Sequence, residues 1–198
     1  MDATNRMSNA TQAGDLSGDT ATDGAPPRTP SQTIGPFSHE AWRWAVDATA
    51  PATVPSASAS SLILHGTIRD GEGQPVNDAV IEAWLPQAAA LEAALPMPGF
   101  RRVPSDDAGG FSFSLPAEAI QADGKPLLYV TIFARGLVRH QFTAVFRADD
   151  ATLAGAEILE QVPAARRATL LATREADGRY RWDIHLQGPQ ETVFFDYC

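Results

Sequence analysis

Cysteine is almost absent from this chain, which has one, Cys198, among 198 residues. A single cysteine has no partner for an internal disulfide, which suits a protein of a reducing compartment. Cys198 is also a poor candidate nucleophile, because it is the terminal residue and a catalytic thiol needs a base held beside it. We therefore expect a cytoplasmic protein whose fold depends on its hydrophobic core.

Long apolar runs and excess positive charge are missing as well. No apolar run approaches the roughly 18 residues of a membrane span, and the N-terminus lacks the basic and hydrophobic regions of an export signal. Acidic residues outnumber basic ones by 24 to 15, and the formal net charge is -9. Such a charge works against binding phosphate backbones or anionic lipids. We expect neither nucleic acid nor a membrane as a partner.

Local motifs for chemistry are also lacking. The sequence has no G-x-S-x-G elbow, no phosphate- or dinucleotide-binding glycine loop and no C-x-x-C pair. The four histidines, His39, His65, His140 and His185, are never spaced i,i+2 or i,i+4, so no two of them form a local metal pair. The carboxylates around Asp70 and Asp106 lack the spacing of a calcium loop and suit turns, where they accept backbone hydrogen bonds.

Composition divides the chain into three parts. Residues 1–28 are rich in Asp, Thr, Ala, Gly and Ser and contain few large apolar side chains, so we expect a disordered N-terminal tail. Residues 29–61 carry several prolines, including Pro36 after Gly35, and are expected to form an extended arm and a linker. Residues 62–198 have the strand and turn signals of a folded domain.

The domain is predicted to be all-β, a two-sheet antiparallel β-sandwich with short helices in its connections. Its central strand is Leu127 to Ala134, which is apolar at both parities and is therefore expected to be covered on both faces, with Arg135 returning to the surface. The first two strands are expected to pair as a hairpin across Asp70–Gly73. Strands are predicted at residues 62–70, 79–84, 111–115, 127–134, 142–146, 168–173, 180–187 and 191–196, and short helices at 87–95 and 156–161.

Several longer stretches resemble one known family. These are TPSQTIGPF at 29–37, GTIRDGEGQPVNDAVIEAW at 66–84, VTIFARGLVRHQFT at 130–143, VPAARRATLLA at 162–172 and YRWDIHLQGPQETVFFD at 180–196. Together they are similar to the intradiol ring-cleavage dioxygenases, and among these to the alpha chains of the αβ members that act on protocatechuate. The resemblance implies a beta chain as partner, which holds a mononuclear ferric iron through two tyrosines and two histidines. It also implies that protocatechuate and O2 meet at a shared site and give 3-carboxy-cis,cis-muconate, in aromatic catabolism by the beta-ketoadipate pathway.

The iron ligands have no counterparts in this sequence. In the catalytic chains of the family a His-x-His lies on the central strand, and alternate residues of a strand share a face, so both imidazoles reach one ion. The matching positions here are Leu127 and Tyr129, and no tyrosine occurs in 87–103. We therefore interpret the chain as non-catalytic and free of iron, with apolar packing in place of the site.

The resemblance also assigns four residues to the edge of the beta chain's pocket: Thr33, Gly35 and Pro36 in the arm, and Arg135 after the central strand. Gly35 and Pro36 allow backbone close to an aromatic ring, and a guanidinium favours a carboxylated catechol. Arg135 could instead pair with an acidic residue of either chain. Two departures from the family, the short 85–103 segment and FTAVFR after the central turn, leave the substrate open. The alternative to the subunit reading is a stand-alone β-sandwich that binds or supports another molecule.

Overall fold

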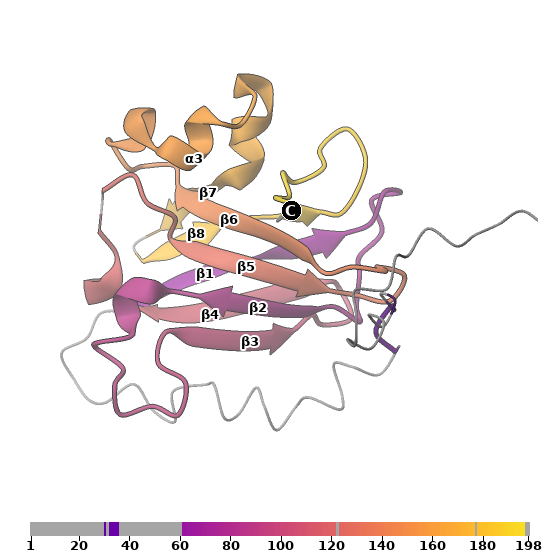
Figure 1. Ribbon diagram of the computed structural model, residues 1–198, viewed down its shortest axis with the longest axis horizontal. Helices are drawn as coiled ribbons and strands as arrows, with labels where there is room; N and C mark the ends of the chain where they lie inside the picture. The colour runs from indigo at the N-terminus through magenta and orange to yellow at the C-terminus, as the bar shows by residue number, and fades with distance from the viewer. Residues whose placement is uncertain (1–29, 31, 36–60, 122, 177, 197–198) are drawn as a thin grey trace, which may run out of the picture. The chain divides into compact units, whose positions relative to one another are not determined.

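The computed structural model describes residues 30, 32–35, 61–121, 123–176 and 178–196 (Figure 1). The predicted tail, most of the predicted arm and linker, Pro36, His39 and Cys198 lie outside these residues. Everything below concerns the unit that runs from Ser31 to the end of the chain.

Nine strands are formed by the described residues, and helical segments are short. The strands are β1 (Ser61–Arg69), β2 (Val80–Trp84), β3 (Phe100–Pro104), β4 (Gly110–Pro116), β5 (Leu128–Phe133), β6 (Gln141–Arg147), β7 (Leu171–Ala176), β8 (Arg179–Arg181) and β9 (Ile184–His185). The helical segments are the 3-10 turns η1 (Pro86–Ala88), η2 (Ala117–Ala119), η3 (Leu153–Gly155) and η4 (Ala164–Leu170), and the α-helix α3 (Glu157–Glu160).

The strands follow one continuous order, β3-β2-β5-β6-β7-β8-β1-β4, and β9 pairs with β1 beside this path. The strands β3, β2, β5 and β6 form one half of the sandwich, and β7, β8, β1 and β4, with β9, form the other half. A short parallel pairing of β6 with β7 joins the two halves. The two ends of the path meet, because β3 contacts β4 and Arg101 Nε donates to the carbonyl oxygen of Ser114 at 3.3 Å. This confirms the predicted all-β sandwich. Three pairings, β1–β8, β1–β9 and β6–β7, are parallel, so the sheet is mixed.

The main core lies between the two halves. It is formed by alternate, inward-facing residues of the strands, as the period of two along a strand requires. A smaller core lies on the outer side of β6, where η3, α3 and η4 cover it (Figure 1). The main core includes Leu64, Ile68, Ile81, Phe113, Leu115, Leu128, Val130, Ile132 and Ile184, and the smaller one Ala144, Phe146, Leu159, Val162 and Leu170.

The predicted hairpin of residues 62–70 with 79–84 is wrong. β1 pairs with β4, β8 and β9, whereas β2 pairs with β3 and β5 in the other half. The chain does reverse after Asp70, whose N–H donates to the Gln74 carbonyl at 2.9 Å, but only an isolated bridge of Arg69 with Pro75 follows. The Val76 N–H donates to the Ile68 carbonyl at 3.0 Å, and the chain then passes to β2 in the other half.

Three other predicted elements differ. The strand expected at 168–173 begins only at Leu171, because η4 occupies residues 164–170, where Thr169 Oγ1 donates to the Arg166 carbonyl at 2.8 Å. The strand expected at 180–187 is divided into β8 and β9, and 191–196 is irregular although the Phe195 N–H donates to the Phe142 carbonyl. The helix expected at 87–95 is regular only as η1, and that at 156–161 is α3.

In the part of the chain that the structure covers, no helix is long and apolar enough to cross a lipid bilayer.

Candidate functional site

The strand β5, which was predicted to be central, lies between β2 and β6 and divides its side chains between two environments. Leu128, Val130 and Ile132 point into the main core and are fully buried. The alternate residues Tyr129 and Thr131, like Phe133, are only half-buried on the outer face. Within the described residues the strand is therefore fully covered on one face and half open on the other, where it was expected to be covered on both.

The outer face carries a shallow aromatic groove of about 290 Å³. Trp84 on β2 is 41% exposed there, and Tyr129 stacks on Phe142 of β6 with ring centres 6.1 Å apart. Trp84 and Tyr129 are direct cross-strand partners in the β2–β5 register. The groove is lined by Glu82, Ala83, Trp84, Phe100, Tyr129, Thr131 and Phe142.

The positions that match the family's His-x-His lie at the start of β5. Leu127 is 5% exposed and belongs to the main core, and its side chain has no atom that can bind a metal. Tyr129 supplies one phenol, which faces the groove. No three His, Cys, Asp or Glu side chains come together as a metal site within the described ranges. The side chains at these positions therefore do not fit a ferric ion, which needs several oxygen or nitrogen donors.

The end of β5 leads into a tight turn that joins it to β6. The Leu137 N–H donates to the Ala134 carbonyl at 3.2 Å, which places Arg135 and Gly136 at the two central positions. Gly136 has φ +90°, as the second central residue of a type II turn requires. The turn therefore presents the Arg135 side chain outward at the end of the strand, as the sequence indicated.

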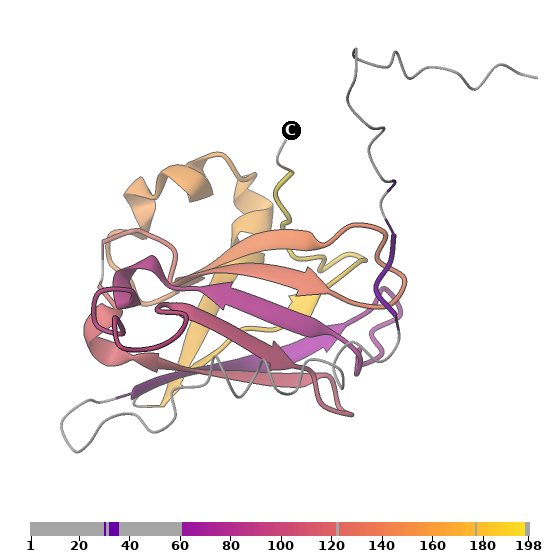
Figure 2. The same cartoon turned by 60° about the horizontal axis from the view of Figure 1, so that its bottom comes forward.

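The arm meets this turn. Thr33 Oγ1 accepts a hydrogen bond from the N–H of Gly136 at 3.0 Å. Gly35 is exposed, and a Cβ atom added to it would meet nothing within 4 Å. Three of the four residues assigned to the pocket edge, Thr33, Gly35 and Arg135, thus lie on two segments that touch each other (Figure 2), while Pro36 is outside the described residues.

Arg135 forms an ion pair with Asp78, which comes just before β2. Arg135 Nε lies 3.2 Å from Asp78 Oδ2, and the side chains are 66% and 10% exposed, respectively. The alternative that Arg135 pairs with an acidic residue of its own chain is therefore realised in this structure. The Arg135 side chain as a whole nevertheless remains two-thirds exposed.

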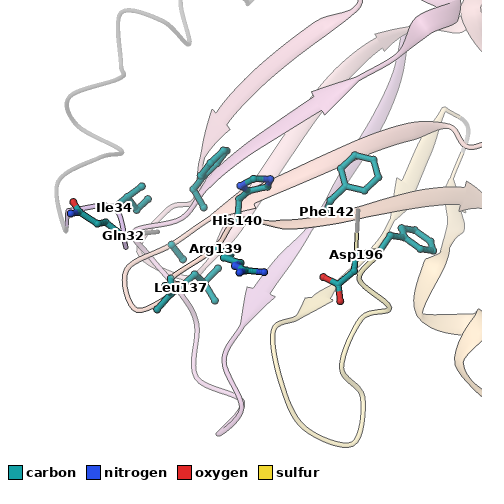
Figure 3. Close-up of a pocket in the computed structure, with 11 residues that line it drawn as sticks. Gln32, Ile34, Leu137, Arg139, His140, Phe142 and Asp196 are labelled. Carbon is teal, nitrogen blue, oxygen red and sulfur yellow. The ribbon is translucent and has the colours of Figure 1, made fainter. Parts of the chain in front are cut away.

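A cleft of about 380 Å³ opens beside the turn (Figure 3). The arm residues Gln32 and Ile34 form one side, and Asp196 lies across the cleft. Its interior is aromatic, with Phe133 beside His140 at 5.5 Å between ring centres, and Phe142, which also borders the groove. The cleft and the groove therefore share Phe142 as a common lining residue.

The short segment between β2 and β3 is held by a nearly buried ion pair. Arg101 contacts both carboxylate oxygens of Glu92, with Nη1 3.0 Å from Oε2, and the Gly99 N–H donates to the same Oε2 at 2.8 Å. Burial by itself would raise the pKa of Glu92, but the hydrogen bonds from Arg101 and Gly99 outweigh it and lower that pKa. The segment thus has a defined path beside the groove.

Other residues noted in the sequence are placed away from the turn. His65 Nε2 lies 2.9 Å from Glu175 Oε2, and Asp70 and Asp106 each accept backbone N–H groups in their own turns, as expected. Asp78 was not singled out from the sequence. Its place is explained by the β2–β5 register, whose last pair is Val80 with Phe133 and which leaves Asp78 and Arg135 each two residues beyond, but that register is known only from the structure.

Comparison with known proteins gives a consistent assignment. The chain is 35% identical over 191 residues to the protocatechuate 3,4-dioxygenase alpha chain of Burkholderia cepacia, covering 85% of this chain and 97% of that one. It is 34% identical over 201 residues to the alpha chain of the same name from Pseudomonas putida, covering 86% and 97%. No protein-family model matches the chain.

Among solved structures, the fold is similar to the dioxygenase domain of a dioxygenase and carbohydrate-binding protein fusion from Streptomyces sp. SirexAA-E. The TM-score is 0.53 at 13% identity, with 85% of this chain and 96% of that chain covered. At that identity the likeness concerns the fold alone. The near-complete match to the two alpha chains decides the family: the chain belongs to the intradiol ring-cleavage dioxygenases and, within them, to the protocatechuate 3,4-dioxygenase alpha chains.

Proposed function

We propose that this chain is the non-iron-binding alpha subunit of a protocatechuate 3,4-dioxygenase and pairs with an iron-bearing beta chain. The observation that carries this proposal is the match to two alpha chains over 97% of their lengths. A match of that extent leaves only about 3% of either alpha chain unmatched. It therefore supports a whole subunit of such an enzyme and not an isolated sandwich module.

The assignment of iron to the partner rests on the donor atoms of this chain. Leu127 replaces one potential ligand with a buried hydrocarbon side chain, and the phenol of Tyr129 is a single donor. Fe(III) is held by several hard oxygen or nitrogen ligands, so one phenolate is insufficient. In the beta chain, ferric iron would bind the catechol oxygens and activate the ring toward O2. The role of this chain would be to help bind and orient the substrate.

Its own contribution is the edge of the pocket. The arm and the β5–β6 turn are joined through Thr33 and Gly136, so they lie side by side on one surface. Arg135 extends from that surface with an exposed guanidinium, which complements the carboxylate of protocatechuate. Gly35 and Pro36 present backbone without a bulky side chain or, for proline, without an N–H. These four residues would favour a carboxylated ring over plain catechol.

Cytoplasmic aromatic catabolism fits this role. The substrate is a soluble aromatic acid. In the product, 3-carboxy-cis,cis-muconate, the C–C bond between the two hydroxyl-bearing ring carbons is broken, and each of these carbons has taken one oxygen atom of O2 to become a carboxyl group. The lack of disulfide-forming cysteines is compatible with a reducing cytoplasm.

Co-expression with a beta chain tests the proposal. We expect a stable complex that contains iron in its beta chain, shows tyrosinate-to-iron charge-transfer colour and converts protocatechuate. The same beta chain expressed alone is the control for activity that needs both subunits. Failure of the two chains to associate, with this chain remaining a well-behaved monomer or homodimer, would favour the stand-alone module instead.

A further inference from the structure

Asp78 is an unusual carboxylate in this structure, because its side chain is nearly buried while the arginine that pairs with it is mostly exposed. Its side chain is 10% exposed, whereas the Arg135 side chain that faces it is 66% exposed. A carboxylate taken out of water needs a cation or hydrogen-bond donors. Within the described residues, the ion pair recorded for Asp78 is the one with Arg135 Nε at 3.2 Å.

The backbone on both sides of the pair is fixed. Ala79, directly after Asp78, donates its N–H to Ser105 Oγ at 3.0 Å and accepts the Ser105 N–H at 2.9 Å. Arg135 stands in the turn that Leu137 closes and that Thr33 contacts. The β2–β5 register ends with Val80 opposite Phe133, and Asp78 and Arg135 each lie two residues beyond this last pair.

The contact joins Asp78 Oδ2 to Arg135 Nε, and the Arg135 side chain as a whole stays 66% exposed beside it. The guanidinium also carries two terminal nitrogens, which are further donors. Those terminal nitrogens are able to bind a carboxylate in the two-point manner typical of arginine. A free arginine would lose much side-chain entropy on binding, and a neighbour that holds Nε in advance reduces that loss.

We infer that Asp78 is a positioning residue for Arg135, which holds the guanidinium so that its terminal nitrogens face the substrate carboxylate. The inference rests on the proposed function and deepens it. Asp78 also has an opposing effect, since its negative charge weakens the attraction of Arg135 for an anion. We expect orientation to win, because the carboxylate is fixed in the protein while long-range attraction at an exposed arginine is screened by water and salt.

The test uses the assembled enzyme of this chain with an iron-bearing beta chain. Asp78→Asn keeps the size of the side chain and removes its charge. We expect KM for protocatechuate to rise about two- to fivefold, the size of a partly exposed ion pair, with kcat nearly unchanged. Asp78→Glu keeps the charge and should lie closer to the original enzyme. Asp123→Asn is the matched control. Asp123 pairs with Lys125 at 2.8 Å just before the first residue of β5, at the end of the strand away from Arg135, so this substitution should leave KM unchanged.

A double-variant cycle separates orientation from any other role. In the Arg135→Met background, Asp78→Asn should change KM no further, because the residue it positions is gone. The inference would be overturned if Asp78→Asn raised KM by the same factor with Arg135 and with Arg135→Met. It would also be overturned if Asp78→Asn lowered KM or abolished assembly of the complex. If Arg135→Met raises KM and Asp78→Asn does not, Asp78 alone has been misassigned. If Arg135→Met has no effect either, the proposed role of Arg135 fails and the inference fails with it, whereas absence of a complex would refute the subunit assignment.

Discussion

Thr33 and Gly136 are 103 residues apart in the sequence, and the threonine hydroxyl accepts the glycine N–H at 3.0 Å. This hydrogen bond attaches the arm to the turn that carries Arg135. Both segments are assigned to the pocket edge, so the contact makes one surface out of two pieces of chain. Substitutions in the arm should therefore alter the position of Arg135, and substitutions in the turn should alter the position of the arm.

Replacing Arg135 by methionine should weaken binding of the carboxylated substrate. In the complex with a beta chain, we expect Arg135→Met to raise KM for protocatechuate roughly tenfold, the loss expected for a charge-assisted hydrogen bond. The iron colour should remain. Unsubstituted catechol is the control, because it has no carboxylate to lose and its kinetics should change much less. Equal losses for both substrates would indicate a damaged interface.

The purified chain should not hold iron. At the positions of the family's histidines it has Leu127, which is buried in the core, and Tyr129, which offers one oxygen. Metal analysis after treatment with a chelator should therefore find far less than one iron per chain, and no tyrosinate-to-iron absorption should appear. Iron retained at about one equivalent would contradict the assignment of the metal to the beta chain.

Removing the hydroxyl of Thr33 should loosen the arm. Thr33→Val keeps the shape of the side chain but cannot accept the Gly136 N–H. We expect exchange of the Gly136 amide hydrogen to become about two- to tenfold faster, the range for one net hydrogen bond. Thr33→Ser retains the hydroxyl and is the matched control. Equal exchange in both variants would mean that the contact does not order the arm.

Adding a side chain at Gly136 should strain the turn. Gly136→Ala meets no steric block, but φ +90° is a conformation that residues with a Cβ rarely adopt. We expect a loss of about 1 kcal/mol, or a fall in Tm of about 2–4 °C, for a domain of this size. Gly155→Ala also enters open space, at a backbone without positive φ, and should be nearly neutral. A neutral Gly136→Ala would refute the strained turn.

Stability should depend on pH through Asp183. Burial alone would raise the pKa of Asp183, but the Arg181 guanidinium and the Thr67 N–H and hydroxyl outweigh it and hold that pKa below the ordinary aspartate value of 3.8. Because the folded pKa is the lower one, the carboxylate stabilises the fold fully above the unfolded value and loses this effect as the pH falls through the folded value.

Asp183→Asn should therefore lower the free energy of unfolding at neutral pH, with the difference from the original chain shrinking below about pH 4. Urea unfolding at a series of pH values measures it. The exposed Glu118 provides the comparison, since Glu118→Gln should follow the original chain at every pH. A constant difference for Asp183→Asn between pH 7 and pH 3 would show that the charge of Asp183 does not contribute.

The strand composition, the resemblance to the family and the lack of the two histidines can be read from the residues alone. These depend on residue identity at matched positions, and Leu127 and Tyr129 can be read there without coordinates. The sequence also indicated Arg135 and Gly136 as a turn after the central strand, because glycine at such a place has a local conformational reason. The bounds of β5, Leu128–Phe133, lie within one residue of the predicted strand.

Which strands are neighbours could not be predicted and is visible only in the folded chain. A period of two shows which residues share a face, but it does not say which strand lies alongside, because that choice depends on contacts between distant segments. For this reason the pairing of β1 with β4 rather than with β2 was missed. The partnership of Asp78 with Arg135 depends on the β2–β5 register, and the contact of Thr33 with Gly136 on the path of the arm, so both became visible only when the chain was folded.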